Sequence, residues 1–144
     1  LLDADLDQVL QGLQGPMEPS LVIRFGYQIL QALDFMHKKQ LVHHDIKTLN
    51  IMICGFTGKM SPENLKAQLP TCLAKIIDVG MCKKYDQSVG FAIESKFHGG
   101  TRIYNCPEKT PGQSYDPYKS DSYSVGMVLV ELLLGMGWLK SKMK

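Results

Sequence analysis

The chain has 144 residues, of which 44% are apolar and 21% are charged, close to the averages of globular proteins. A chain of this length and composition can bury a hydrophobic core, which argues against an intrinsically disordered protein. Sixteen basic and fourteen acidic residues give a net charge of +2. That charge is too small to indicate a nucleic-acid partner.

Two amphipathic helices are predicted in the first forty residues. Apolar residues recur at three- and four-residue intervals over residues 3–13, with Asp3 or Asp5 available to cap the start. A longer run with the same spacing covers residues 20–39, and Pro19 suits its first turn. We expect a helix over each run.

The middle of the chain alternates short strands with long connections. Two short runs rich in isoleucine, residues 51–53 and 74–77, predict a pair of strands. One helical turn is expected in their connection, over residues 63–69. Residues 81–101 show no hydrophobic period and carry several glycines, which predicts a mobile loop.

The most apolar segment, residues 125–139, has two interpretations. It is short for a membrane span, which needs about 20 apolar residues, and it contains Glu131. We therefore expect no membrane span. The favoured interpretation is a helix over residues 120–134 buried in the protein core, with Ser120 as its cap and Asp121 in its first turn.

The four cysteines, Cys54, Cys72, Cys82 and Cys106, are widely spaced and form no C-x-x-C pair. This spacing argues against a zinc site and gives no support to a disulfide framework. No basic stretch followed by an apolar run opens the chain, so no signal peptide is expected. These observations favour four reduced thiols in an intracellular, cytoplasmic protein.

Residues 43–50, H-H-D-I-K-T-L-N, gather the groups that phosphoryl transfer requires. They include a carboxylate at Asp45, a cation at Lys47 and an amide at Asn50, and a second carboxylate, Asp78, follows 33 residues after the first. A carboxylate can accept the proton of an attacking hydroxyl, and a cation can neutralise charge on the moving phosphoryl group. Carboxylate and amide oxygens can hold a divalent metal. Each residue alone is weak evidence, and the order and spacing carry the argument.

Four motifs in order resemble the eukaryotic protein kinase family. The segment H-H-D-I-K-T-L-N resembles the catalytic loop H-R-D-L-K-x-x-N, and D-V-G at residues 78–80 resembles D-F-G. The segment G-T-R-I-Y-N-C-P-E at residues 100–108 resembles the end of the activation segment, and S-D-S-Y-S-V-G at residues 120–126 resembles the start of the central helix. This resemblance implies an α+β, mainly helical fold. It would be an incomplete kinase-like large lobe with a small β-hairpin beside the catalytic loop.

The resemblance also implies a role for each residue of the catalytic loop. Asp45 would be the catalytic base, and Lys47 would be a catalytic residue that contacts the transferred phosphate of ATP. Asn50 and Asp78 would hold Mg²⁺. Met52 would lie under the adenine ring and so bind the cofactor.

Further residues are implied to support these groups. Thr101 would position the substrate loop against Asp45 and Lys47. The combination of Lys47 with Thr101 indicates a protein substrate with a serine or threonine acceptor. Four residues are implied to have structural roles: His43, Gly80, Glu108 and Asp121.

The sequence departs from the family pattern at several positions. His44 stands where most members have an arginine that pairs with an activation-loop phosphate, so we expect little dependence on loop phosphorylation. Val79 replaces the phenylalanine of D-F-G, which we interpret as a smaller core side chain, with a less secure stack as the alternative. Cys106 replaces a small alanine. The long connection from Asn50 to Asp78 predicts a surface insertion.

The motifs of the kinase small lobe are not found in the sequence. It contains no Gly-rich loop before a strand lysine, and nothing resembles the helices that follow the central helix. We therefore expect residues 1–144 to be a partial kinase domain, running from the helix after the hinge through the central buried helix.

Three functions remain open from the sequence. The favoured one is a serine/threonine kinase catalytic lobe that acts within a longer protein and turns over negligibly alone. The alternative is a non-catalytic, kinase-derived binding or scaffold module. A remote third is an unrelated metal-dependent phosphotransferase, which would need Asn50 and Asp78 but not the two later motifs.

Overall fold

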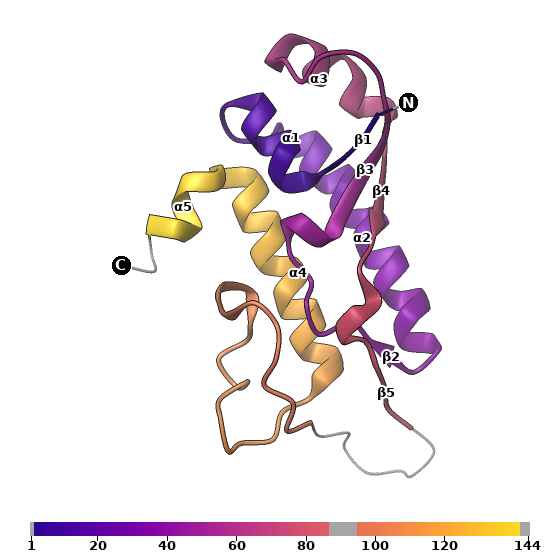
Figure 1. The fold of residues 1–144 in the computed structure, drawn as a ribbon, viewed down its shortest axis with the longest axis vertical. Coiled ribbons are helices and arrows are strands. Elements are labelled where there is room, and N and C mark those ends of the chain that lie inside the picture. Colours follow the sequence, from indigo (N-terminus) through magenta and orange to yellow (C-terminus); the bar gives the residue numbers. More distant parts are fainter. Residues whose placement is uncertain (1, 87–94, 142–144) are drawn as a thin grey trace.

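The computed structural model describes residues 2–86 and 95–141 (Figure 1). Within these residues the helices are α1 (Leu6–Leu13), α2 (Pro19–Lys38), α3 (Pro62–Gln68), α4 (Pro117–Leu134) and α5 (Met136–Ser141). The strands are β1 (Leu2–Asp5), β2 (Leu41–Val42), β3 (Ile51–Phe56), β4 (Leu73–Ile76) and β5 (Lys83–Lys84). The expected class, α+β and mainly helical, is confirmed.

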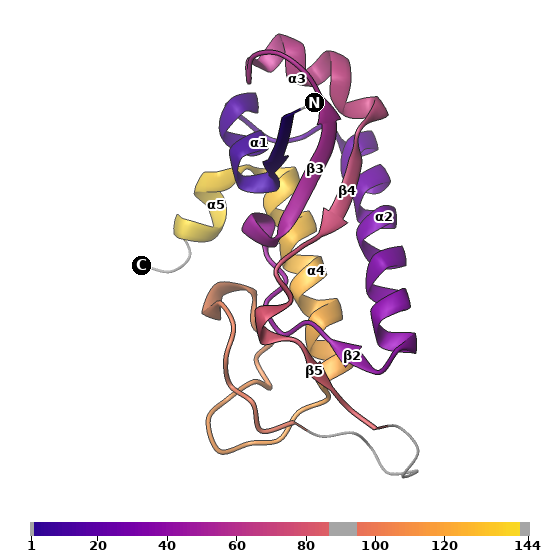
Figure 2. The same ribbon diagram turned by 45° about the vertical axis from the view of Figure 1, so that its right-hand side comes forward.

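The larger sheet is antiparallel with strand order β1-β3-β4, and it lies along α2 (Figure 2). Ile51 pairs with Ile76 and Met52 pairs with Lys75 across β3 and β4. Since side chains alternate along a strand, Ile51 and Ile53 are buried while Met52 lies on the opposite, more open face. A second, two-stranded ladder joins β2 to β5.

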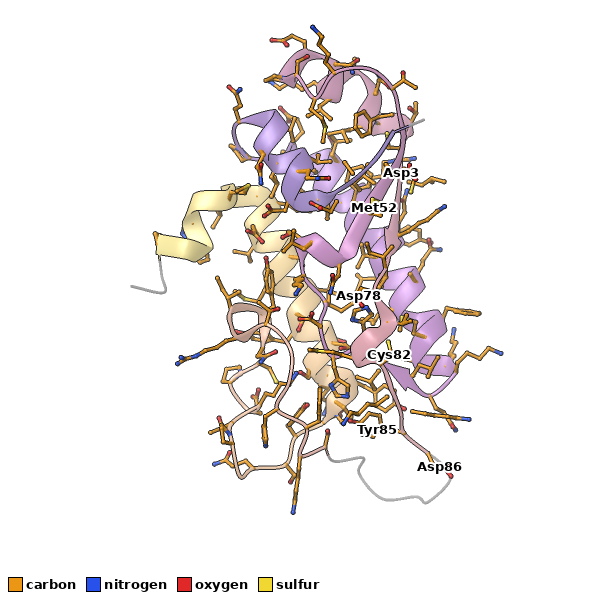
Figure 3. The ribbon with its side chains drawn as sticks, in the orientation of Figure 1. Asp3, Met52, Asp78, Cys82, Tyr85 and Asp86 are labelled. Atoms are coloured by element: carbon orange, nitrogen blue, oxygen red, sulfur yellow. The ribbon has the colours of Figure 1, made fainter. Side chains whose placement is uncertain are left out.

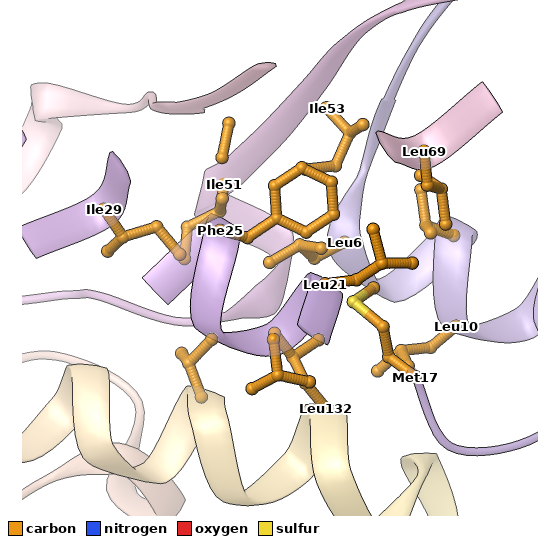
Figure 4. Packing of buried hydrophobic residues seen from close by; sticks show 14 of the residues in the cluster. Leu6, Leu10, Met17, Leu21, Phe25, Ile29, Ile51, Ile53, Leu69 and Leu132 are labelled. Atoms are coloured by element: carbon orange, nitrogen blue, oxygen red, sulfur yellow. The ribbon is translucent and has the colours of Figure 1, made fainter. Parts of the chain in front are cut away.

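The hydrophobic core lies between α1, α2, α4 and the inner face of the larger sheet. Phe25 of α2 is fully buried and packs in the same cluster as Leu6 of α1 and Leu132 of α4 (Figure 4). Full burial of a side chain of this kind contributes about 1.5–3 kcal/mol. Gly26 permits close packing of α2 on α4, because a Cβ there would lie 3.0 Å from a methyl group of Leu129.

The first predicted helix begins later than expected. Residues 2–5 form β1, which pairs with β3, and α1 starts only at Leu6. Asp5 is the cap: its carboxylate accepts a hydrogen bond from the Gln8 backbone N–H at 2.8 Å, and the Gln8 side chain accepts one from the Asp5 N–H at 3.2 Å. Asp3 is therefore a strand residue. Asp5 is thus both the last residue of β1 and the N-cap of α1.

The other elements of the first half agree closely with expectation. Helix α2 starts at Pro19 and ends one residue before the expected end at residue 39, which confirms that prediction. Strands β3 and β4 include nearly all of the two predicted runs. The expected single turn over residues 63–69 is the two-turn helix α3, and the Oγ of Ser61 caps it by accepting from the Asn64 N–H at 3.3 Å.

The last long helix buries one face in the core and exposes the other, which includes Tyr123, Leu133 and Leu134, so it is less buried than expected; it also begins three residues early. Asp116 caps it by accepting hydrogen bonds from the Tyr118 and Lys119 N–H groups at 3.0 and 3.1 Å, so Ser120 is not the cap. Asp121 consequently lies in the second turn rather than the first. No helix in the described part of the chain has the length and apolarity that a membrane crossing requires.

The segment after β4 was expected to be a mobile loop over residues 81–101. It contains the short strand β5, which pairs with β2, so part of it is regular. Ser95 also pairs with Tyr115 in an isolated antiparallel bridge. Residues 87–94, at the centre of the expected loop, lie outside the described residues.

Candidate active site

The candidate site is built on a loop between β2 and β3, and Asp121 of α4 holds this loop in place. The Asp121 carboxylate is 1% exposed and accepts the backbone N–H of His43 at 2.7 Å and that of His44 at 2.9 Å. The His37 Nε2 lies 3.1 Å from the same carboxylate. A buried carboxylate is tolerated when donors surround it in this way, and here they fix the loop backbone to the central helix.

His43 connects the same loop to the strand that leads to Asp78. Its Nδ1 accepts the Asp45 N–H at 3.3 Å, so its Nε2 carries the proton and donates to the Ile77 carbonyl at 3.0 Å. The Ile77 N–H in turn donates to the Asn50 carbonyl at 2.9 Å. The two segments that carry the candidate catalytic and metal-binding side chains are therefore joined directly.

Asp45 lies at the centre of a cluster of four hydrogen-bond donors. One carboxylate oxygen, Oδ1, accepts the Thr101 N–H at 2.9 Å and the Thr101 hydroxyl at 2.8 Å. The other, Oδ2, lies 2.9 Å from the Lys47 Nζ and accepts the Asn50 Nδ2 at 3.2 Å. The Lys47 ammonium also donates to the Thr101 hydroxyl at 3.0 Å. The structure thus brings together four of the residues singled out in the sequence.

These contacts decide the charge of Asp45. Burial raises the pKa of the carboxyl, but the hydrogen bonds from Lys47 and Thr101 and the charge of Lys47 outweigh it, and the pKa is lower than usual. The carboxylate is therefore ionised at neutral pH. An ionised carboxylate at this position can accept a proton from a hydroxyl group placed next to it.

Asn50 and Asp78 provide oxygen atoms that suit a hard divalent cation. The Asn50 Nδ2 donates to the Asp45 carbonyl at 2.8 Å as well as to its carboxylate, which directs the amide oxygen away from Asp45. Asp78 is exposed on the turn after β4, where its Oδ1 accepts the Gly80 N–H at 3.1 Å (Figure 3). Within the described residues its Oδ2 accepts no hydrogen bond, which leaves it available as a ligand.

This donor set fits Mg²⁺, although it is incomplete by itself. Among the described residues no group of three or more His, Cys, Asp or Glu side chains could hold a metal. Magnesium is commonly bound by one or two carboxylates together with water and the phosphates of a substrate. Asn50 and Asp78 can supply the protein's part of such a shell.

Met52 and Val79 lie outside the hydrophobic core. Met52 is half-buried on the open face of β3, above the turn that carries Asp78 (Figure 3). Val79 is 68% exposed, so its interpretation as a core side chain is wrong. The reason is local: Asp78 has a φ of +61°, and Val79 begins a short 3₁₀ turn with no buried residue.

Two of the residues with implied structural roles differ in their surroundings. Gly80 donates its N–H to Asp78 and so shapes the turn after β4. Glu108 is exposed and forms no ion pair with any residue that the structure describes. Its structural role therefore stays a prediction.

Lys109 also contributes to the structure of the site, although the sequence did not indicate it. It is 8% exposed, and its Nζ donates to the His44 carbonyl and to the Asn105 side-chain oxygen, both at 3.3 Å. Burial lowers the pKa of this ammonium group. Lys109 joins the loop that carries Asp45 to the segment that carries Thr101, and no spacing rule indicates that contact.

Tyr104 and Glu131 form a second buried contact that was missed. The Tyr104 hydroxyl donates to the Glu131 carboxylate at 2.6 Å and lies 3.1 Å from the Thr48 hydroxyl. Burial, followed by the hydrogen bond to Glu131, raises the pKa of Tyr104. A signal was present in the sequence, since a glutamate inside a run of apolar residues indicates a buried partner.

His44, which stands at the family's arginine position, is neutral. Its Nε2 lies 2.8 Å from the Tyr85 hydroxyl, and its buried Nδ1 has no hydrogen-bond partner among the described residues. Burial is the main cause that lowers the pKa of His44 to about 4. An imidazole in this state cannot serve as a cation at neutral pH.

Comparison with known proteins assigns the chain to a family. The family model of the protein kinase domain matches residues 2–144, nearly the whole chain. The chain belongs to the protein kinase family. The expected kinase-like large lobe agrees with this assignment; the two strands of the expected small β-hairpin, β3 and β4, are paired, and β1 extends them to a three-stranded sheet.

Individual kinases match over most of this chain but only part of their own length. The serine/threonine-protein kinase PknB of Mycobacterium tuberculosis is 33% identical over 122 residues, which are 85% of this chain and 17% of PknB. The mouse serine/threonine-protein kinase Nek9 is 33% identical over 127 residues, 88% of this chain and 11% of Nek9. A probable PknB of Bifidobacterium longum is 35% identical over 107 residues, 74% of this chain and 13% of that protein. The chain therefore spans less than one fifth of these relatives.

Proposed function

We propose that this chain provides the catalytic loop of a protein serine/threonine kinase, which transfers the γ-phosphoryl group of ATP to a protein hydroxyl with the help of Mg²⁺. The observation that supports this most is the ionised carboxylate of Asp45, with donors from Lys47, Asn50 and Thr101 within 3.2 Å. Phosphoryl transfer depends on positioning and charge stabilisation more than on covalent chemistry by the protein. A preorganised polar cluster of this kind meets that need.

In this proposal Asp45 accepts the proton of the substrate hydroxyl. A carboxylate has about four acceptor sites, and four donors already occupy those of Asp45. A substrate hydroxyl must therefore replace one of them. The Asn50 amide is the simplest to exchange, because its contact of 3.2 Å is the longest and because Asn50 keeps its second bond to the Asp45 carbonyl.

The negative charge of the phosphates would be neutralised by Lys47 and by Mg²⁺ bound to Asn50 and Asp78. The Lys47 Nζ bridges Asp45 and Thr101, and we infer that it turns one of its N–H groups to the transferred phosphoryl group. The oxygens of Asn50 and Asp78 would hold Mg²⁺, which when bound neutralises charge on the phosphates. Met52, on the open face of β3, would contact the adenine ring.

The substrate class and location form part of the same proposal. PknB and Nek9 are named serine/threonine kinases, and the contact between Lys47 and Thr101 supports that acceptor class here. A cavity of about 640 Å³ lies beside Thr101. It is lined in part by Gly100 and Arg102, and it offers room for a segment of a protein substrate.

The proposed location of the protein rests on its cysteines. All four cysteines are free thiols, which supports an intracellular, cytoplasmic location.

A second function, a non-catalytic binding or scaffold module, is favoured by one observation. Asp78 and Val79 are exposed, and among the described residues the Asp78 side chain accepts a hydrogen bond only from Gly80, in its own turn. Few groups of this chain would therefore hold a nucleotide. For this reason we expect weak nucleotide binding and negligible turnover from the 144 residues alone.

Magnesium-dependent nucleotide binding tests the proposal. Titration of the chain with a non-hydrolysable ATP analogue, followed by NMR, should show shifts at Met52 and Asp78 that require Mg²⁺. Asp78→Ala should weaken binding at least tenfold, and Asp34→Ala, which removes an exposed carboxylate on α2, should leave it unchanged. Equal binding by both variants would contradict the proposal, and no binding at millimolar analogue would favour the scaffold function.

A further inference from the structure

The ring of Phe97 lies against His44 and Lys83, which come from other parts of the chain, and the Lys109 ammonium lies farther away, 5.7 Å from the ring centroid. The His44 ring meets it edge-on, with ring centroids 4.8 Å apart. The Lys83 ammonium of β5 lies over its face, 3.8 Å from the ring centroid. Both arrangements are favourable for an aromatic ring, whose face is negative and whose edge is positive. Phe97 therefore joins the catalytic loop to the start of the segment that follows Asp78.

The backbone of Phe97 is fixed as well as its ring. Its N–H donates to the Ser95 hydroxyl at 3.1 Å, and its carbonyl accepts a hydrogen bond from the Tyr115 hydroxyl. Ser95 and Tyr115 also exchange two backbone hydrogen bonds, at 2.8 and 3.1 Å. Since Thr101 follows only four residues later, the position of Phe97 restricts where Thr101 can lie.

On the side of the Phe97 ring where His44 lies, the side chains of His44, Tyr85 and Ser95 form a network of neutral groups. The Tyr85 hydroxyl lies 2.8 Å from the His44 Nε2 and 2.8 Å from the Ser95 hydroxyl. A charged imidazole would carry a second N–H at the buried Nδ1 of His44, where no described residue accepts it. The position that faces the Lys83 ammonium is thus occupied by the aromatic ring of Phe97. His44, which is neutral, adds no positive charge at this position.

We propose that Phe97 is the positioning residue that sets Thr101 against Asp45, and that its ring, held by Lys83 and His44, makes a loop phosphate unnecessary for this placement. The inference rests on the proposed function for the role of Thr101 in substrate binding. The placement itself is a property of the folded chain. It can therefore be measured without ATP, metal or substrate.

Hydrogen exchange at the Thr101 amide measures this placement directly, because that N–H donates to the Asp45 carboxylate. In the unphosphorylated chain the amide should be protected. Phe97→Ala should raise its exchange rate about tenfold, and Phe97→Leu should raise it too, since leucine restores volume but not a π face. Phe97→Tyr should retain the protection. Amides of α2 such as that of Ile29 serve as the internal control for folding.

A second variant keeps the test decisive if Phe97→Ala disturbs the fold. Lys83 is exposed, so Lys83→Met removes the cation with little risk to the core, and Thr101 exchange should rise about two- to fivefold. Lys84→Met, at the neighbouring exposed position, should leave it unchanged. Unprotected Thr101 in the unphosphorylated chain, or wild-type protection in Phe97→Leu or Lys83→Met, would overturn the inference. A failure of nucleotide binding would leave these rates untouched and would count against the proposed function alone.

Discussion

Thr101 donates both its backbone N–H and its hydroxyl to the same oxygen of Asp45, at 2.9 and 2.8 Å, across a sequence separation of 56 residues. The other oxygen of Asp45 is bound within its own loop, by Lys47 and Asn50. The carboxylate is therefore shared between two segments that are distant in sequence. The pKa of the Asp45 carboxyl group therefore depends on whether the two segments are in contact.

Removal of the Thr101 hydroxyl should raise the pKa of Asp45. In Thr101→Ala the carboxylate loses a donor that stabilises its charged form, and the Lys47 Nζ loses the hydroxyl it bonds to. The pKa can be followed by ¹³C NMR of the Asp45 carboxyl carbon. Thr101→Ser is the matched control because it retains the hydroxyl. An equal shift in both variants would show that packing of the threonine methyl group, and not the hydrogen bond, is responsible.

The stability of the fold should decrease as the pH falls from about 6.5 to about 4, because of His44. Burial lowers its folded-state pKa to about 4, so between these values the unfolded chain binds a proton that the folded chain does not. The full effect would be up to about 3 kcal/mol. Urea unfolding at several pH values should show a smaller decrease in His44→Gln, which cannot titrate but can still bond to Tyr85. The same slope in both proteins would assign it to other groups.

Asp121 should be far more important for stability than an exposed aspartate. In Asp121→Ala the backbone N–H groups of His43 and His44 lose their acceptor inside the protein, with an expected cost of about 3 kcal/mol or more. Asp34→Ala removes an exposed ion pair with Lys38 and should cost less than about 0.5 kcal/mol. Urea denaturation of both variants measures the difference. Similar values would mean that the loop does not depend on its anchor in α4.

Gly100→Ala should displace Thr101 from Asp45. Gly100 has a φ of +94°, and a Cβ there would overlap the His44 carbonyl oxygen. Gly112 has a similar φ of +83° but open space around it, so Gly112→Ala reports the backbone strain alone. Each variant can be examined by the exchange rate of the Thr101 amide. A larger increase in Gly112→Ala than in Gly100→Ala would contradict the steric argument.

The parts of the fold that follow a local pattern were predictable from the sequence. Helix α2 repeats its apolar residues over five turns, and Pro19 marks its start. Strand β1 was missed because its partner, β3, lies about fifty residues away and because Asp5 begins a strong helical pattern immediately afterwards. The start of α4 was misplaced for a similar reason: both Asp116 and Ser120 are good capping residues, and Pro117 decides between them.

The site was predictable to a different extent. The order of the motifs placed Asp45, Lys47 and Asn50 in one loop, and the structure has them in contact. The contacts of Lys109 and Phe97 could not be predicted, because they depend on how two segments pack and not on any spacing within one. The metal-binding roles of Asn50 and Asp78 and the substrate-positioning role of Thr101 remain predictions.

The anchoring of the loop at Asp121 has a consequence for the order of folding. The hydrogen bonds from His43 and His44 to this carboxylate close separations of 78 and 77 residues, far longer than those that build α2 or the β3–β4 pair. Contacts so distant in sequence form late, since loop closure must precede them. We therefore expect that during synthesis the groups around Asp45 align only after α4 has left the ribosome, later than the strands and helices of the first half form.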